Sequence, residues 1–352
     1  MFWTYPTTSP AHFSNLGVSL IFRLGLTGIA RCRTSNIMTT TNCCAQCGVA
    51  GCASLKTCKS CMEAKYCDAT CQRNHWPMHK QDCKLRAAEL RDEALFKDPP
   101  AKEDCPICFL PMPGKILSCV TLPPATISSV PINYFADAHQ ELANLTTETY
   151  YSCCGKSICG GCVHSFHESG NLKCPFCNAD RNKTVEEQVE DNMKRVEAND
   201  PPSICLLAYC CYKGLNGVQQ DHVKAKELYV RAADLGFNKA HYHLGMLYHE
   251  GGNLKKARFH FEAAAMLGDE LARNNLGSIE FESGNMERAV THWTIGASGG
   301  DYLAMHKLKI CFGKDYVSRV SIDSTLAAYN SSCAEMRSEA RDSYIRFNLE
   351  TM

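Results

Sequence analysis

Hydrophobic positions in the second half of the chain recur with a fixed period. Residues 237–268 and 269–300 are two consecutive stretches of 32 residues, and Leu244-Gly245 in the first recurs as Leu276-Gly277 in the second. A period in the thirties predicts stacked helical hairpins. One hairpin cannot bury its apolar face alone, so we expect several copies to stack into a continuous core.

Further copies flank these two. An earlier, slightly longer copy ends at Gly236, and the tail after Asp301 begins a degenerate fourth copy. The pattern therefore predicts an all-α helical-hairpin solenoid over residues 203–310. A C-terminal helical cap is expected over residues 311–352.

Two charged stretches with helical character precede the repeats. Residues 85–104 and residues 183–202 are each predicted to form a linker helix. In the second, Thr184 followed three residues later by Glu187 is a capping-box signal. The prolines after Asp200 are expected to end that helix, because proline disfavours helix at the preceding residue.

The first 42 residues lack such a pattern and are expected to be a disordered leader. No Asp or Glu occurs in the first 62 residues, which resembles an organelle transit peptide over residues 1–37. The competing interpretation, which we favour, is a disordered leader or an upstream extension before a true start at Met38. No stretch of the chain reaches the roughly 18 apolar residues that a membrane helix needs.

Chain length and net charge bear on the number of domains and on the kinds of binding partner. The 352 residues suggest two or three domains. Lys+Arg and Asp+Glu both number 37, so the formal net charge is zero. A neutral chain gives no support for direct binding to nucleic acid or to an anionic membrane.

Cysteine is the residue that changes this picture most. The chain has 24, of which 18 lie between Cys43 and Cys177. Cysteine-rich chains form either disulfide frameworks or metal sites. Regular C-x2-C pairs, in a chain with a long core-forming second half, favour zinc. We therefore expect a multidomain protein with two small zinc-stabilised modules before the solenoid.

Residues 43–84 form the first module. Its four pairs offer eight ligands, enough for two tetrahedral zinc sites. The pairs are Cys44-x2-Cys47, Cys58-x2-Cys61, Cys67-x3-Cys71 and His79-x3-Cys83. Closed sites of this kind are structural, and zinc supplies the folding energy of a module too small for its own core.

The run from Cys71 to Cys83, with Gln72, His75 and Trp76, resembles the MYND zinc finger family. The resemblance covers residues 44–83 and implies two interleaved sites. One zinc would be held by Cys44, Cys47, Cys67 and Cys71, and the other by Cys58, Cys61, His79 and Cys83. Cys43, Cys52 and His75 are spare by this pattern.

MYND fingers are similar in binding short proline-rich peptides, and they are not enzymes themselves. The resemblance implies that Gln72 and Trp76 contact the peptide. Residues four apart share one helix face, and an exposed aromatic side chain suits proline docking. The alternative is that Trp76 packs in the small core.

Residues 105–182 form the second module, again with eight candidate ligands in four pairs, here all cysteines. The stretches Cys105-Pro106-Ile107-Cys108 and Cys174-Pro175-Phe176-Cys177 resemble the RING finger family. The resemblance implies one site at Cys105, Cys108, Cys159 and Cys162, and another at Cys153, Cys154, Cys174 and Cys177. About four zinc ions are expected for the whole chain, with Cys119 as an alternative ligand in this module.

RING fingers commonly act as ubiquitin ligases that dock a ubiquitin-conjugating enzyme and form no covalent intermediate. The resemblance implies that Ile107 and Pro175 belong to the docking surface. Three features depart from the pattern: the middle pair lacks a histidine, the loop over residues 109–152 is long, and Asn178 replaces a frequent cation. In that loop, residues 133–145 could form a short helix.

The repeats resemble the SEL-like subfamily of tetratricopeptide-type hairpins. The motifs are Leu244-Gly245-x2-Tyr248, Lys256-Ala257 and Ala264-Ala265-x2-Gly268. The resemblance implies a surface for partner proteins. Isolated cysteines here are expected to be core thiols; they are Cys205, Cys210, Cys211, Cys311 and Cys333. His241 and His243 are expected to be satisfied or solvated.

No catalytic constellation accompanies these motifs. The leading hypothesis is an adaptor that acts as a RING-type ubiquitin ligase and recruits substrates through its repeats and MYND finger. The alternative is a non-enzymatic scaffold that bridges partner proteins. A cytoplasmic or nuclear location fits either hypothesis.

Overall fold

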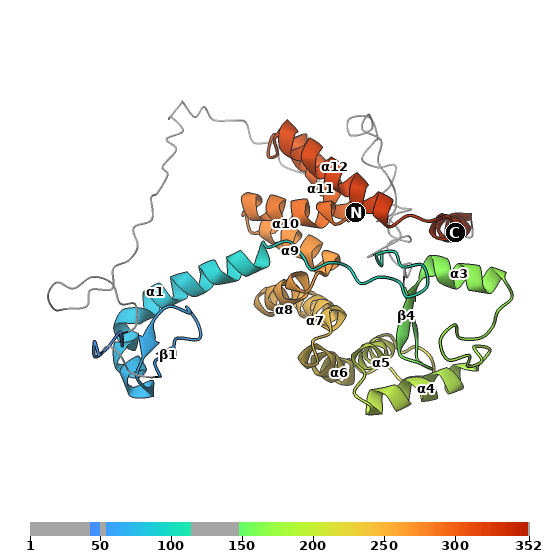
Figure 1. Cartoon of the computed structure of the whole chain (residues 1–352), viewed down its shortest axis with the longest axis horizontal. Helices are drawn as coiled ribbons and strands as arrows, with labels where there is room; N and C mark the ends of the chain where they lie inside the picture. Colours follow the sequence, from blue (N-terminus) through green and yellow to red (C-terminus); the bar gives the residue numbers. More distant parts are fainter. Residues whose placement is uncertain (1–42, 50–53, 114–147, 351–352) are drawn as a thin grey trace. The chain divides into compact units, whose positions relative to one another are not determined.

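The structure is a computed structural model that describes residues 43–49, 54–113 and 148–350 (Figure 1). The expected leader, Met38, Cys52, Cys119 and the expected helix at 133–145 lie outside the described residues. The chain divides into two compact units, one up to Leu90 and one from Arg91 onward. Each is described by itself.

The first unit is a small zinc-finger-like module with a two-stranded sheet. Strand β1 (Lys56–Thr57) pairs antiparallel with β2 (Lys65–Tyr66), and helix α1 (Ala69–Leu95) follows. The backbone N–H of Cys71 donates to Asp68 Oδ1 at 2.8 Å, so Asp68 satisfies one of the free donors of the first turn. Tyr66 is buried, and its hydroxyl lies 3.0 Å from His75 Nδ1.

Helix α1 is longer than the motif alone requires. The sequence separates a zinc-finger helix from a linker helix at 85–104, but the structure has one continuous helix of 27 residues. No glycine or proline occurs between Cys83 and Leu95, so nothing interrupts helical hydrogen bonding there. The last turn, from Arg91, belongs to the second unit.

The second unit begins with the other cysteine module. Strand β3 (Glu148–Tyr151) pairs antiparallel with β4 (Lys156–Cys159), and helix α3 (Gly160–Glu168) follows directly. Helix α4 (Val185–Glu197) starts with the predicted capping box, since Thr184 and Glu187 each bond the other's backbone N–H. Val196 of α4 is buried with α5 and α6, so α4 is part of the helical array.

Further helices form the rest of this unit, and all but the last of them stack against one another along the chain (Figure 1). They are α5 (Pro201–Lys213), α6 (His222–Asp234), α7 (Asn238–Glu250), α8 (Leu254–Met266), α9 (Glu270–Glu282), α10 (Met286–Ser298), α11 (Tyr302–Phe312), α12 (Arg319–Glu335) and α13 (Glu339–Glu350). Helix α5 starts at Pro201, because proline is tolerated in the first turn, where Asp200 caps the helix.

The recurrent Leu-Gly pair lets the helices of a hairpin approach closely. A Cβ added at Gly245 would lie 2.5 Å from the Phe261 ring, and one at Gly277 would lie 2.3 Å from Trp293 Nε1. Each glycine therefore accommodates an aromatic ring from the second helix of its own hairpin. The five isolated cysteines expected as core thiols are all buried. The fold is thus a helical-hairpin solenoid that follows cysteine-rich modules, as predicted.

Helix α13 leaves the array that it was expected to cap. It packs along α3 of the cysteine module. A Cβ at Gly160 would lie 2.4 Å from the Tyr344 ring, and one at Gly161 would lie 2.7 Å from the backbone nitrogen of Arg341. The two glycines at the start of α3 therefore allow α13 to approach.

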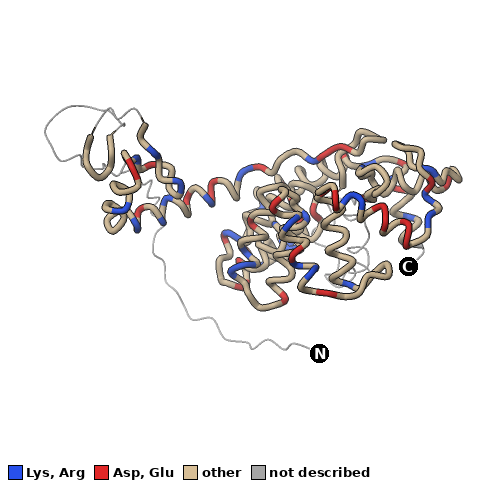
Figure 2. Tube along the Cα trace, turned by 90° about the horizontal axis from the view of Figure 1, so that it is seen from below, with Lys and Arg blue, Asp and Glu red and all other residues tan. Residues whose placement is uncertain are grey.

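Charge is mixed along the described trace, and Figure 2 shows Lys and Arg interspersed with Asp and Glu. None of the described helices is long and apolar enough to cross a membrane.

Candidate metal centres

The first unit brings together two groups of four ligand atoms. The first cluster is Cys44, Cys47, Cys67 and Cys71, and the second cluster is Cys58, Cys61, His79 and Cys83. Within each, the ligand atoms all lie within 4.8 Å of one another. His79 and Cys83 are one helical turn apart on α1, which places both on one face.

The second unit brings together two further groups. The third cluster is Cys105, Cys108, Cys159 and Cys162, and the fourth cluster is Cys153, Cys154, Cys174 and Cys177. In both modules the first and third pairs along the chain share one cluster, and the second and fourth pairs share the other. The two ligand sets of each module therefore interleave along the sequence, because a pair of one cluster lies between the two pairs of the other.

The distances within the clusters fit zinc. Zinc–sulfur bonds of about 2.3 Å in a tetrahedron place two sulfurs about 3.8 Å apart. The Sγ–Sγ distances are 3.5 Å for Cys47 and Cys67, 3.7 Å for Cys58 and Cys83, 3.9 Å for Cys105 and Cys162, 3.8 Å for Cys108 and Cys159, and 3.6 Å for Cys154 and Cys174. Cys61 Sγ lies 3.4 Å from His79 Nε2, close to the roughly 3.5 Å of a mixed pair. The four clusters therefore suit about four zinc ions.

Four of the cysteine pairs sit on the same backbone turn. In each, the residue after the second cysteine donates its N–H to the carbonyl of the first cysteine, at 2.8–3.0 Å. That residue has a left-handed backbone in all four: Gly48, Met62, Phe109 and Asn178, with φ of 71°, 56°, 56° and 58°. In each of these turns both cysteine thiols of the pair belong to the same cluster.

This turn gives a reason for Asn178, where a cation is frequent in RING fingers. Asparagine is one of the few residues with a side chain that adopts the left-handed region readily. The position is thus occupied by a residue suited to the turn. Arg181, the nearest arginine, instead lies over the Tyr151 ring at 4.8 Å.

The adjacent pair Cys153-Cys154 reaches the same cluster, although neighbouring residues rarely point together. The next residue, Gly155, has φ of 72°, and its N–H donates to Tyr151 O at 2.7 Å. This tight turn between β3 and β4 brings both thiols toward Cys174 and Cys177. Cys43 belongs to none of the four clusters.

Burial and neighbouring thiols oppose ionisation of one ligand of the second cluster, Cys83. The pKa of Cys83 is raised to about 12, first by burial and then by the neighbouring Cys58 and Cys61. Without a cation this thiol stays protonated at neutral pH. Binding of zinc therefore displaces protons from the cluster.

Sequence reasoning missed one residue at the third cluster. Arg341 of α13 is 3% exposed, and its Nε donates to Cys159 Sγ at 3.4 Å while Nη2 donates to Cys108 Sγ at 3.5 Å. The same guanidinium donates to the carbonyls of Leu110, Pro111 and Met336 at 3.2, 2.8 and 2.6 Å. Two effects lower the pKa of Cys159: first the hydrogen bond with Cys162, and then Arg341.

The signal that could have indicated this contact is the glycine pair after Cys159. Two glycines at the start of a helix indicate close approach of another backbone. They do not say which segment approaches, and Arg341 lies 182 positions further along the chain.

The residues predicted to contact partners are at the surface to different degrees. Trp76 is 41% exposed, whereas Gln72 is half-buried one turn before it. Ile107 and Pro175 are both half-buried within the second module. The exposure of Trp76 weighs against a role confined to core packing.

Two family models match the chain. Residues 44–83 match the MYND finger, and residues 201–237 and 238–269 each match the Sel1 repeat. The chain carries a MYND finger and Sel1 repeats. The MYND finger holds the first and second clusters, and the two matched Sel1 repeats are the hairpins α5–α6 and α7–α8. These modules support a protein-interaction adaptor.

Solved structures of repeat proteins are among those similar to the chain. One is a Sel1 repeat protein from Oxalobacter formigenes, with 20% identity, a TM-score of 0.38, and coverage of 51% of this chain and 72% of that one. Another is c5321, a protective antigen present in uropathogenic Escherichia coli strains that displays an SLR fold. Its identity is 19% and its TM-score 0.35, with 53% of this chain and 43% of that chain covered.

Proposed function

We propose that this adaptor is a RING-type ubiquitin ligase that recruits substrates through its Sel1 repeats and its MYND finger. The sixteen residues of the four clusters are its zinc ligands. The observation that carries the proposal is the third and fourth clusters, in which alternate cysteine pairs come together around a β-hairpin followed by a helix.

The chemistry required of this chain is positioning alone. Each cluster has four protein ligands and leaves no open coordination position, so the zinc ions are structural. Bound zinc would hold the two loops that carry Ile107 and Pro175. Those residues would dock a ubiquitin-conjugating enzyme, whose thioester is attacked by a substrate lysine without a covalent intermediate on this chain.

Replacing Ile107 with glutamate tests this docking surface. We expect loss of self-ubiquitination by at least ten-fold, because a charge at a half-buried apolar contact opposes docking. The assay uses zinc-loaded full-length protein with a panel of conjugating enzymes, and zinc content is measured alongside. Val185→Glu, an exposed apolar residue of α4 outside the clusters, is the matched control. Chain formation that survives Ile107→Glu at four zinc ions would refute the docking model.

The MYND finger is proposed to bind proline-rich peptides through Trp76. An exposed aromatic on a helix offers a flat apolar surface for a polyproline segment. We expect Trp76→Ala to weaken binding of a labelled proline-rich peptide about 30-fold, the effect of losing a hot-spot residue worth about 2 kcal/mol. Met78→Ala serves as control, since Met78 is 79% exposed and two positions away. Equal affinities of the two variants would count against the peptide site.

The alternative is a scaffold without ligase activity, and one observation favours it. Helix α13 covers part of α3, so a face of the second module is already engaged within the chain. No ubiquitin chains with any conjugating enzyme, at full zinc content, would favour this alternative. For either function we propose a cytoplasmic or nuclear location, where thiols stay reduced; organelle targeting by residues 1–37 is the competing hypothesis.

A further inference from the structure

A segment of the chain lies across the helices α8, α9 and α10. This segment, residues 91–102, is here named the strap. Leu95 is fully buried in a core with Ala257, Phe261 and Leu276. Arg273 Nη1 of α9 donates to the carbonyl of Leu95 at 2.9 Å. The strap thus contacts the helices through the Leu95 side chain and through the Leu95 backbone carbonyl.

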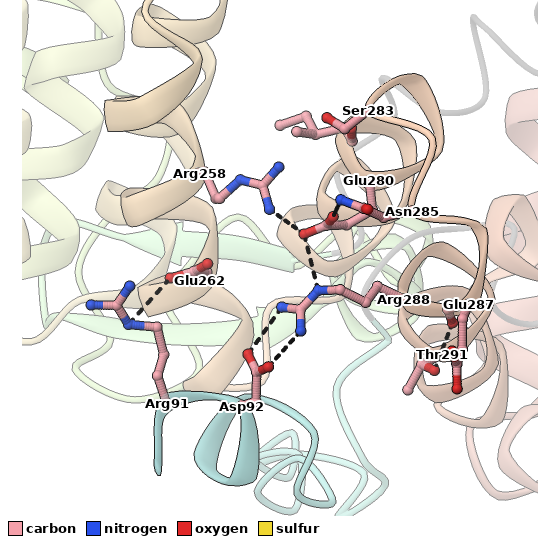
Figure 3. Close-up of polar contacts among 11 residues, drawn as sticks. Arg91, Asp92, Arg258, Glu262, Glu280, Ser283, Asn285, Glu287, Arg288 and Thr291 are labelled. Atoms are coloured by element: carbon pink, nitrogen blue, oxygen red, sulfur yellow. Dashed lines mark hydrogen bonds and ion pairs between the residues drawn. The ribbon is translucent and has the colours of Figure 1, made fainter. Parts of the chain in front are cut away.

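Charged groups fix the strap on both sides of Leu95. Arg288 of α10 forms a two-pronged ion pair with Asp92, at 2.6 and 3.0 Å (Figure 3). Its Nε also lies 3.4 Å from Glu280. Further along, Lys102 Nζ lies 2.6 Å from Glu270 and donates to Gly299 O at 2.8 Å.

An aromatic contact lies between these charges. The Phe96 ring is 4.9 Å from the His292 ring, centroid to centroid, and the Arg288 guanidinium lies over Phe96 at 5.0 Å. Asp92, Leu95, Phe96 and Lys102 are therefore the anchors of the strap. Of residues 91–102, all of them described, Leu95 alone is buried.

Beside the apolar core around Leu95, the surface beneath the strap contains buried polar and charged side chains. Four of its residues are at most 8% exposed and carry polar or charged side chains: Glu262, Arg273, Glu280 and His292. Both ring nitrogens of His292 lack a hydrogen-bond partner among the described residues. Leaving buried polar groups unpaired is costly, and permanent cores avoid it.

A surface with unpaired buried polar groups suits a ligand that binds reversibly. We propose that α8, α9 and α10 form a peptide-binding surface, that the strap is its resident occupant, and that a partner protein displaces the strap with a segment of the same chemistry. That segment carries an acidic residue three positions before a leucine-aromatic pair, and a lysine six positions after the aromatic residue. A partner segment that also offers a hydrogen-bonding group to His292 should bind this surface more tightly than the strap does.

This inference deepens the adaptor function and rests on it, because it names the partner class of the repeats. The strap has few anchors and one buried side chain, so local opening exposes the surface without unfolding the helices. An open strap would leave Arg288, Arg273, Glu262 and Glu280 available to a partner. The ligase activity of the second module is not needed for this exchange.

The test measures binding in trans of a fluorescein-labelled peptide with the sequence of residues 89–104. The proteins are full-length and zinc-loaded: wild type, Leu95→Asp, and Ala94→Asp as matched control. Ala94 is the exposed neighbour of Leu95, so both variants gain one carboxylate on the same turn. We expect Leu95→Asp to bind the peptide at least ten-fold more tightly than wild type and Ala94→Asp to match wild type. A peptide that itself carries the Leu95→Asp change should bind none of them.

A Leu95→Asp chain that keeps its helical content and binds no better than wild type would overturn the proposal. If that variant does not fold, hydrogen exchange on the wild-type protein tests whether the strap opens locally. We expect the amides of residues 93–96 to exchange at least ten-fold faster than the buried amides of α8 and α9, through local opening. Equal protection would mean that the strap is permanent core and would also overturn the proposal. Neither readout requires ubiquitin transfer, so a failed ligase assay leaves this inference standing.

Discussion

Removing zinc from the purified chain is expected to unfold residues 44–83 while helices α5 to α12 stay folded. The buried residues of the MYND finger, among those described, are Cys44, Cys58, Cys61, Tyr66, His79 and Cys83, so five of these six side chains are ligands. Structural zinc contributes roughly 10–16 kcal/mol per site, and no apolar core replaces it. The helical array has separate apolar cores, built around Tyr229, Phe261 and Trp293 among others.

The measurement is a chelator titration followed by hydrogen exchange. Peptides from residues 54–83 should lose protection as zinc leaves, while those from α8 to α10 should keep theirs. Cys61→Ser should lose one zinc ion from the MYND finger, whereas Cys205→Ser should lose none. Both cysteines are buried, but Cys205 belongs to none of the four clusters. Protection of residues 54–83 in chain free of zinc would contradict the prediction.

Acid should have the same effect as the chelator on the MYND finger. Zinc binds the thiolate, and the raised pKa of Cys83, about 12, means that a proton holds this thiol strongly in the metal-free state. Lowering the pH therefore favours the protonated, metal-free form and releases zinc. Zinc affinity therefore falls as the pH falls, because the zinc-bound form of the thiol is the deprotonated one.

The spacing of cysteines predicted much of the site because it is a local property. A C-x2-C pair closes a turn of five residues, and the four knuckles here share one hydrogen bond and one left-handed position. The Leu-Gly pairs are local in the same sense. Gly245 and Gly277 each face an aromatic ring of their own hairpin, 16 positions later. Such short-range relations leave a visible period in the sequence.

The contacts that escaped prediction join distant parts of the chain. Arg341 and Cys159 are 182 positions apart, and Arg288 and Asp92 are 196 apart. No period or spacing connects residues at such separations. The stretch 85–104 was predicted as a linker because it is charged. In the structure two of its charged residues, Asp92 and Lys102, are anchors of the strap, so composition alone could not distinguish a solvated linker from a docked one.

The grouping of ligands into clusters came from family resemblance. The pairs in the sequence fit several groupings, and three-dimensional proximity brings the first pair together with the third. The same holds for Cys153-Cys154, where Cys119 was an open alternative. Gly155 supplies the turn that brings both neighbouring thiols to one cluster.

Replacing Arg341 with methionine is expected to speed release of one zinc ion, that of the third cluster, 10- to 100-fold. Partners that hydrogen-bond to metal ligands change metal affinity by this factor when they are removed. Four thiolates and one zinc ion carry a net charge of −2, and Arg341 is a buried cation in contact with two of these sulfurs. Losing it also leaves the carbonyls of Leu110 and Pro111 without this donor, at about 1–3 kcal/mol for each that stays buried and unpaired.

Lysine should restore this role only in part. The guanidinium donates to two sulfurs and three carbonyls at once, and an ammonium group has three donors without the planar fork. We therefore expect the release rate of Arg341→Lys to lie between those of wild type and Arg341→Met. A purely steric role for the side chain would instead make lysine and methionine alike, since both have long unbranched stems.

The measurement is transfer of zinc to a chromogenic chelator, resolved into phases. Wild type should release its ions slowly, and Arg341→Met should show one fast phase that corresponds to one zinc ion per chain. Arg346→Met is the matched control, because Arg346 is exposed on the same helix and donates a hydrogen bond to Ser343 within that helix. Loss of α13 protection in hydrogen exchange should accompany the fast phase, since α13 packs on α3 beside this cluster. Release at the wild-type rate by Arg341→Met would mean that α13 covers the third cluster without stabilising it.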